Sequence, residues 1–143
     1  MTNEQRPSFE WAVERGKVAE FARAVLNASS AHDGPDAVAP PTFPQSMALW
    51  RSRTPRPEQD VGREGLDMRR VLHGEQEFEY VRPLRVGDVL TAESHVKDRY
   101  SKEGKRGGTM TFIVSETIFR DQSGEIVAYS RGTTIQTSKA ATS

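Results

Sequence analysis

Two polar side chains that could handle a proton follow the first helix-like stretch of the chain. Asn27 and His32 lie five residues apart on the loop that leaves this stretch. An amide and an imidazole placed there can converge on one water or one acidic C–H, as hydration or dehydration next to a carbonyl requires. Alternatively, Asn27 caps the helix C-terminus in a left-handed conformation and His32 has no chemical role. Spacing by itself leaves both interpretations open.

The other histidines lie in strand-like sequence. His73 stands before Gly74 at the entry to an alternating run, where it could line a cleft or bridge backbone groups. His95 lies in the middle of a later run, and we expect it on the solvated face. No pair of histidines has metal-site spacing, and the sequence contains no cysteine. We therefore expect no metal and no cofactor.

Composition narrows the classes of partner. The 143 residues carry 20 Lys+Arg and 20 Asp+Glu, so the formal net charge is zero. A protein dedicated to polyanions needs a basic excess, so we expect no nucleic-acid partner. No apolar run is long enough to span a membrane and no secretory signal begins the chain, so we expect a cytoplasmic protein without a membrane partner.

The first half of the chain favours one amphipathic helix and long loops. Residues 13–26 place apolar side chains at helical spacing, which predicts a buried stripe. Prolines interrupt residues 27–44, and Pro44 suits the first position of a short helix. Residues 51–60 are polar and charged, which indicates a surface loop or mobile flap. The apolar stripe of the first helix consists of Val18, Phe21, Ala22 and Val25.

The second half of the chain has the period-two alternation of strands. Four runs, starting near residues 71, 90, 109 and 125, are separated by turns at 82–88, 101–108 and 121–124. Four strands joined by turns and preceded by a helix predict an α+β fold with an antiparallel sheet packed on a helix. We expect one domain over residues 8–137 and a disordered tail over 138–143. A single sheet also leaves an uncovered edge, which predicts a dimer.

Residues 72–88 carry a family resemblance. They hold a His-Gly-Glu-Gln strand entry followed by an Arg-Pro-x-x-x-Gly-Asp turn and the start of a further strand. The segment resembles MaoC-like, R-specific enoyl-thioester hydratases and 3-hydroxyacyl-thioester dehydratases, and the strand entry is typical of the N-terminal, non-catalytic-half type. The resemblance implies a single hot-dog domain, in which an antiparallel sheet wraps around a short central helix.

The resemblance also identifies two departures from the catalytic pattern. In the family, Gly-Asp-x-Asn-Pro-x-His follows a helix, and its Asp and His hold the water that adds to the thioester. Here Asn27 occupies the Asp position and His32 the His position. An amide orients water but accepts no proton as a base. Pro44 lies where catalytic members often have a glycine amide, so an oxyanion contact would come from Gln45 or Ser46.

The family includes two-domain enzymes and heterodimers in which one half carries the Asp and His and the other half shapes the acyl tunnel. With these departures and a polar flap over residues 51–65, this chain resembles the tunnel-shaping half. The implied function is a subunit of a (3R)-hydroxyacyl-thioester dehydratase or enoyl-CoA hydratase. Its ligand would be an acyl-CoA or acyl-carrier-protein thioester, and its partner another MaoC-like chain or a second copy of itself. Alternatives are a self-sufficient hydratase using His32, a non-enzymatic acyl-thioester-binding protein and a thioesterase. Candidate substrate-binding residues are Thr42, Phe43, Gln45, Ser46, His73 and Gln76.

Overall fold

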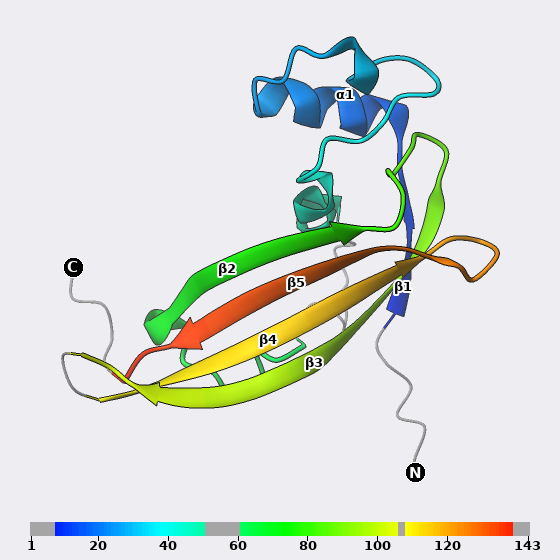
Figure 1. The fold of residues 1–143 in the computed structure, drawn as a ribbon. Coiled ribbons are helices and arrows are strands. Elements are labelled where there is room, and N and C mark those ends of the chain that lie inside the picture. Colours follow the sequence, from blue (N-terminus) through cyan, green and yellow to red (C-terminus); the bar gives the residue numbers. More distant parts are fainter. Residues whose placement is uncertain (1–7, 51–60, 106–107, 139–143) are drawn as a thin grey trace.

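The computed structural model describes residues 8–50, 61–105 and 108–138, and it contains one five-stranded antiparallel sheet. The strands lie in the order β1-β3-β4-β5-β2 (Figure 1). The four predicted strands are confirmed, and their bounds are β2 Val71–Tyr80, β3 Val89–Glu103, β4 Thr109–Arg120 and β5 Ile126–Gln136. The loop at 51–60 and the tail from residue 139 onward lie outside the described residues.

A fifth strand, β1 (Ser8–Ala12), was not predicted. It pairs antiparallel with β3, with Trp11 opposite Leu90. Five residues are too few to establish a period-two pattern, so the sequence contains little signal for this strand. Its position at the sheet edge beyond β3 comes from tertiary packing, because both Trp11 and Leu90 are buried in the core.

The amphipathic helix is confirmed as α1 (Arg15–Ala24), but it is shorter than predicted. Val18 and Ala22 are buried, whereas Val25 is 47% exposed and not part of the buried stripe. The helix ends because Leu26 adopts a left-handed conformation with φ +56°. The amide of Asn27 then donates to the carbonyl of Ala22 at 2.8 Å. The left-handed residue is therefore Leu26, and the interpretation of Asn27 as the left-handed cap is wrong.

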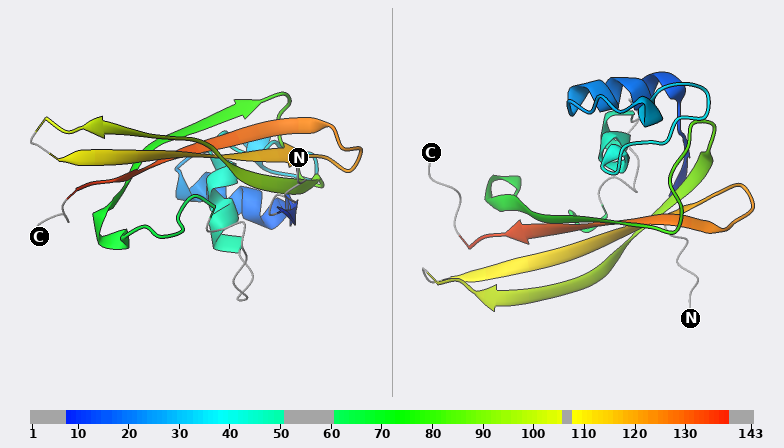
Figure 2. Two further views of the ribbon diagram at one scale, coloured as in Figure 1. Left: turned by 90° about the horizontal axis from the view of Figure 1, so that it is seen from below. Right: turned by 45° about the horizontal axis from the view of Figure 1, so that its top comes forward.

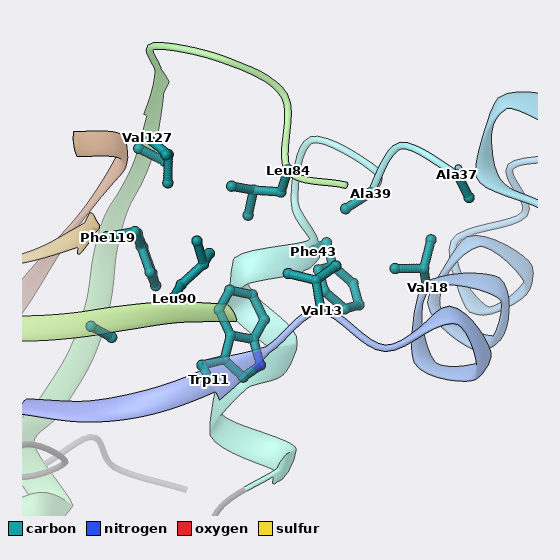
Figure 3. Packing of buried hydrophobic residues seen from close by; sticks show 12 residues of the cluster. Trp11, Val13, Val18, Ala37, Ala39, Phe43, Leu84, Leu90, Phe119 and Val127 are labelled. Atoms are coloured by element: carbon teal, nitrogen blue, oxygen red, sulfur yellow. The ribbon is translucent and has the colours of Figure 1, made fainter. Parts of the chain in front are cut away.

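The short helix predicted after Pro44 is a 3-10 helix, η2 (Phe43–Trp50), which begins one residue earlier. It lies on the same side of the sheet as α1 (Figure 2). Phe43 is fully buried, with its ring stacked on Trp11 at 5.4 Å between centroids and packed edge-on against Phe21 at 5.6 Å. Figure 3 shows Phe43 among apolar side chains from β1, α1 and the strand ends. The sheet thus wraps around a short central helix, as the hot-dog fold requires.

Two short 3-10 turns complete the described elements, η1 (Ser30–His32) and η4 (Met68–Arg70). The apolar core gathers at one end of the sheet, where β3 begins and β4 ends. Further along the same strands, Ser94, Thr117 and Ser130 place hydroxyl groups on the face that η2 covers. Of the helices within the described residues, none has the length and apolar character needed to cross a lipid bilayer.

Candidate functional site

A cavity of about 180 Å³ lies between η2, the segment at residues 61–63 and the side of the sheet that we call the inner face. The four long strands contribute the floor, and their register places hydroxyl and amide side chains next to one another. Most of the lining is polar. The lining residues from the sheet are Phe9, His73, Gln76, Ser94, Ser115, Thr117, Ser130, Gly132 and Thr134, and those from elsewhere are Pro44, Gln45, Met47, Val61 and Arg63.

Hydrogen bonds organise the cavity floor. Ser94 faces Thr117 across β3 and β4, and their hydroxyl oxygens are 2.9 Å apart. The side-chain amide of Gln76 on β2 donates to Ser130 Oγ on β5 at 2.8 Å. Ser115 Oγ donates to the carbonyl of Val61 at 3.2 Å, which attaches the segment at residues 61–63 to the sheet.

Three of the six candidate substrate-binding residues line this cavity: Gln45, His73 and Gln76. The other three do not. Phe43 is a core residue with no exposed surface, which makes it a packing residue. Ser46 is buried and donates its hydroxyl to the Phe43 carbonyl at 2.6 Å. Thr42 is exposed outside the lining.

The turn that leads into η2 is held by Tyr80, the last residue of β2. Its hydroxyl donates to the carbonyl of Pro41 at 2.5 Å. Burial raises the pKa of Tyr80 to about 12, so the phenol stays protonated and can donate. The link fixes the position of Gln45, four residues later, over the cavity.

Asn27 and His32 are brought together at the end of α1. Asn27 Nδ2 lies 3.0 Å from His32 Nε2, and His32 Nδ1 lies 2.6 Å from the carbonyl oxygen of Val38. A carbonyl can only accept, so Nδ1 carries the proton and Nε2 is the acceptor of a neutral imidazole. The backbone amide of Ser29 donates to Asn27 Oδ1 at 3.0 Å, which fixes the amide with Nδ2 towards His32.

This pattern leaves the imidazole without a spare basic nitrogen. One ring nitrogen donates to the backbone and the lone pair of the other accepts from Asn27. A general base needs a lone pair directed at the substrate or at water. The hydrogen bond from Asn27 therefore orients the imidazole of His32 and occupies the lone pair of its Nε2.

The Arg-Pro-x-x-x-Gly-Asp turn supports His32 from a distance in sequence. Val38 forms an isolated antiparallel bridge with Arg85, and the amide of Val86 donates to the carbonyl of Ala37 at 2.9 Å. The turn is closed by Arg82, whose two terminal nitrogens contact the Asp88 carboxylate at 2.8 and 3.2 Å. The hydrogen bond to Asp88 raises the pKa of Arg82. The motif thus positions the carbonyl that orients the imidazole.

The Asn27–His32 pair and the cavity are separate within one chain, because neither residue is among those lining the cavity. The residue types in the sequence predicted the Asn27–His32 pair, but they did not predict the hydroxyl side chains on the cavity floor. Ser94 does share a predicted strand face with Leu90 and Ala92, so a polar position on an apolar face was an available signal. Among the described residues no group of three or more His, Asp or Glu side chains is arranged to hold a metal ion.

Comparisons with known proteins agree with this architecture. Residues 4–130 match the family model described as FAS1-like, dehydratase domain region. A UPF0336 protein of Streptomyces griseus is 35% identical over 133 residues, covering 85% of this chain and 81% of the relative.

Two solved structures from Mycobacterium tuberculosis share the fold. The C-terminally truncated HadBC (3R-hydroxyacyl-ACP dehydratase) complex matches with TM-score 0.72 and 19% identity, covering 94% of this chain and 99% of that chain. The ChsH1–ChsH2 complex matches with TM-score 0.72 and 18% identity, covering 98% and 86%. The chain belongs to the UPF0336 family and to the FAS1-like dehydratase domain region, and its fold is the hot-dog fold of MaoC-like dehydratases.

Proposed function

We propose that this chain is the non-catalytic, substrate-shaping half of a (3R)-hydroxyacyl-thioester dehydratase or enoyl-thioester hydratase. A second MaoC-like hot-dog chain supplies the Asp and His that handle the water. The ligand is an acyl thioester of CoA or of acyl carrier protein.

The observation that carries the proposal is the hydrogen bond from Asn27 Nδ2 to His32 Nε2. A carboxylate at position 27 would accept from a protonated imidazole, whereas the amide donates to it and occupies its lone pair. Replacing a positioned acid–base group typically lowers a rate by about 10²- to 10⁴-fold. This supports a chain that contributes shape and orientation, with proton transfer assigned to the partner.

The free edge of the sheet supports a partner of the same fold. Within the described sheet, β2 is an edge strand that pairs with β5 on one side. Its neighbourhood exposes apolar side chains, since Leu72 is 51% and Met68 is 59% exposed. An edge strand with exposed apolar residues is a template for pairing with another strand. Because His73 and Gln76 lie on this strand, a partner there would border the cavity.

Both structural neighbours, HadBC and ChsH1–ChsH2, are complexes, and HadBC is a 3R-hydroxyacyl-ACP dehydratase. Together with the shared fold, this favours a heterodimer over a second copy of this chain.

The experiment is hydration of a medium-chain enoyl-CoA, followed by loss of absorbance. The purified chain is assayed alone, then mixed with the MaoC-like chain encoded nearest to it. We expect activity in the mixture that exceeds the sum of the separate chains. Activity of equal size in this chain alone would contradict the proposal. Release of free thiol would indicate a thioesterase instead.

A substitution tests the role of position 27. Asn27→Asp restores a carboxylate beside His32, and we expect hydration by the chain alone to rise by about 10²-fold or more. The matched control is Asp33→Asn, because Asp33 is an exposed acid of the same loop whose carboxylate accepts from the Gly34 amide. A folded Asn27→Asp variant as inert as the wild-type chain would show that position 27 is not the lost catalytic position.

A second candidate function is favoured by the same hydrogen bond. A chain whose imidazole is occupied could bind an acyl thioester without turnover. This alternative predicts thioester binding by the chain alone, but no hydration in any mixture with a MaoC-like partner.

A further inference from the structure

The middle of the inner face is polar at the place where the proposed function puts a substrate chain. Along the inner face, the row that joins Ala92, Phe119 and Ala128 is apolar and buried. The next row joins Ser94, Thr117 and Ser130, all of which line the cavity. On β3, β4 and β5 the change from apolar to hydroxyl side chains therefore occurs between neighbouring inner-facing positions.

The cavity presents hydrogen-bonding groups beyond those used internally. In the Ser94–Thr117 pair one hydroxyl donates to the other, and the acceptor keeps its own proton. Ser130 accepts from Gln76 and likewise keeps a proton to donate. Thr134 adds a further hydroxyl to the lining. Together these groups offer several donors that a bound molecule can use.

Gln76 adds an acceptor. Its Nε2 is used by Ser130, while its Oε1 lies beside Gly132, where an added Cβ would stand 3.2 Å away. The glycine therefore leaves room for the amide oxygen at the cavity wall. Among the described lining residues Arg63 carries the one permanent charge, and Arg63 is exposed. The strands contribute hydroxyl and amide groups to the lining, and Phe9, Pro44, Met47 and Val61 contribute apolar surface beside them.

A plain alkyl chain fits the hydroxyl and amide part of this lining poorly. It would displace water from these hydroxyl and amide groups without replacing the hydrogen bonds, and an unpaired buried polar group is costly. Sites that hydrogen-bond a ligand hydroxyl discriminate strongly against the analogue that lacks it, whereas apolar pockets discriminate weakly.

We propose that the cavity is a subsite for a flexible, uncharged chain that carries hydroxyl, carbonyl or amide groups. The proposal rests on the proposed function. In a thioester substrate such groups come from two sources: oxygen substituents on the acyl chain, or the amides and hydroxyl of the pantetheine arm.

The test is isothermal titration calorimetry with the full-length chain, alone and mixed with its MaoC-like partner. Three unreactive probes are compared: a CoA thioether with an alkyl chain, the same thioether with a hydroxyl at mid-chain, and pantetheine. We expect the hydroxylated thioether to bind at least about tenfold more tightly than the alkyl one if the acyl chain occupies the cavity. If instead the pantetheine arm occupies the cavity, we expect free pantetheine to bind without an acyl chain and to compete with both thioethers.

Two substitutions assign the effect to the cavity. Thr117→Val keeps the shape of the side chain and removes its hydroxyl, and Ser130→Ala removes the partner of Gln76. Each should weaken the preferred probe about tenfold and leave the alkyl thioether unchanged or tighter. The matched control is Thr111→Val, the same change on the same strand outside the lining. Unfolding midpoints confirm that each variant is folded.

The outcomes separate this inference from the proposed function. If the mixture hydrates enoyl-CoA but the alkyl thioether binds as well as the hydroxylated one, with no effect of Thr117→Val on any probe, the polar subsite is wrong and the proposed function stands. If no probe binds in either sample and no hydration occurs, both are overturned.

Discussion

The two faces of the same four strands are built from different chemistry. On the inner face, neutral hydroxyls and one amide line a cavity. On the opposite, outer face, the neighbouring residues are charged and cross-linked by ion pairs. The adjacent residues are Gln76 and Glu77 on β2, Ser94 and His95 on β3, Thr117 and Glu116 on β4, and Ser130 and Arg131 on β5.

Glu116 is the centre of the outer network. Its carboxylate accepts from Lys97 Nζ at 2.8 Å and from Arg131 Nε at 2.5 Å, and it lies 3.4 Å from His95 Nε2. Glu116 is only 7% exposed. Burial by itself would raise the pKa of Glu116, but the hydrogen bonds from Lys97 and Arg131 outweigh burial and hold that pKa below its usual value.

Period-two alternation allows both faces to coexist in one sheet. Charges on the outer face have partners of opposite sign, and at Glu116 the hydrogen bonds from Lys97 and Arg131 outweigh the cost of burial. On the floor of the cavity a charge would have no partner of opposite sign on a neighbouring strand, whereas neutral hydroxyls hydrogen-bond to one another at lower cost. The contrast predicts that substitutions on the outer face change stability more than substitutions of the inner-face hydroxyls do.

The largest effect should come from reversing the central outer charge. Glu116→Lys places a cation against Lys97 and Arg131, and we expect the free energy of unfolding to fall by about 3 kcal/mol or more. Chemical denaturation measures the change. The control is Glu75→Lys, an exposed glutamate of β2, which should change stability by less than about 0.5 kcal/mol. Equal effects of the two substitutions would contradict a special role for Glu116.

Protonation of Glu116 at low pH should remove the stabilisation that its ion pairs provide. The pKa of Glu116 is lower in the folded chain than its ordinary value of 4.5, so its contribution is complete above that value. It is lost as the pH falls through the folded pKa. The difference in unfolding free energy between wild type and Glu116→Gln should therefore shrink as the pH is lowered from neutral through the folded pKa of Glu116, which lies below 4.5. A difference independent of pH would show that Glu116 acts by packing alone.

Leu26 belongs to neither face of the sheet. Its substitution is expected to raise the free energy of unfolding, whereas the substitutions on the two faces are expected to lower it. It is 92% exposed and holds a left-handed backbone at the end of α1. Glycine adopts this conformation without steric cost, so Leu26→Gly should stabilise the isolated chain by about 1 kcal/mol. Thermal unfolding measures it. A loss of stability would mean that the exposed leucine makes contacts that outweigh its strain.

The smallest effect on stability should come from the inner face. Thr117→Val removes a hydroxyl whose partner, Ser94, can bond to water in the cavity, so we expect a loss of about 0.5 kcal/mol. Denaturant titration beside Glu116→Lys gives the direct comparison of adjacent residues. A loss as large as that of Glu116→Lys would show that the inner hydroxyls are structural.

Local pattern was sufficient for most of the fold. The four long strands follow from alternation over many residues, and α1 from the spacing of Val18 and Ala22. The end of α1 at Ala24 was not predicted, because the left-handed Leu26 leaves no signal in the spacing of apolar residues. Strand β1 was not predicted, because five residues are too few to show alternation. The resemblance of residues 72–88 to MaoC-like dehydratases supplied the hot-dog topology that pattern alone could not give.

The sequence likewise predicted some features of the candidate site and not others. Spacing brought Asn27 and His32 together as candidates, because both follow one helix end and lie on one loop. The direction of their hydrogen bond could not be predicted, since it depends on the Val38 carbonyl and hence on a bridge to Arg85 far along the chain. The burial of Phe43 could not be predicted, because an aromatic residue in a loop-like segment carries no sign of its packing against Trp11.

The sequence by itself therefore determined the strands, the amphipathic helix and the placement of Asn27 and His32 on one loop, because these depend on residue type and on neighbours a few positions away. The tertiary structure decided which hydroxyls share a cavity and which nitrogen of His32 is occupied. Those features join residues tens of positions apart, and strand register and backbone contacts, which no local pattern encodes, bring them within hydrogen-bonding distance.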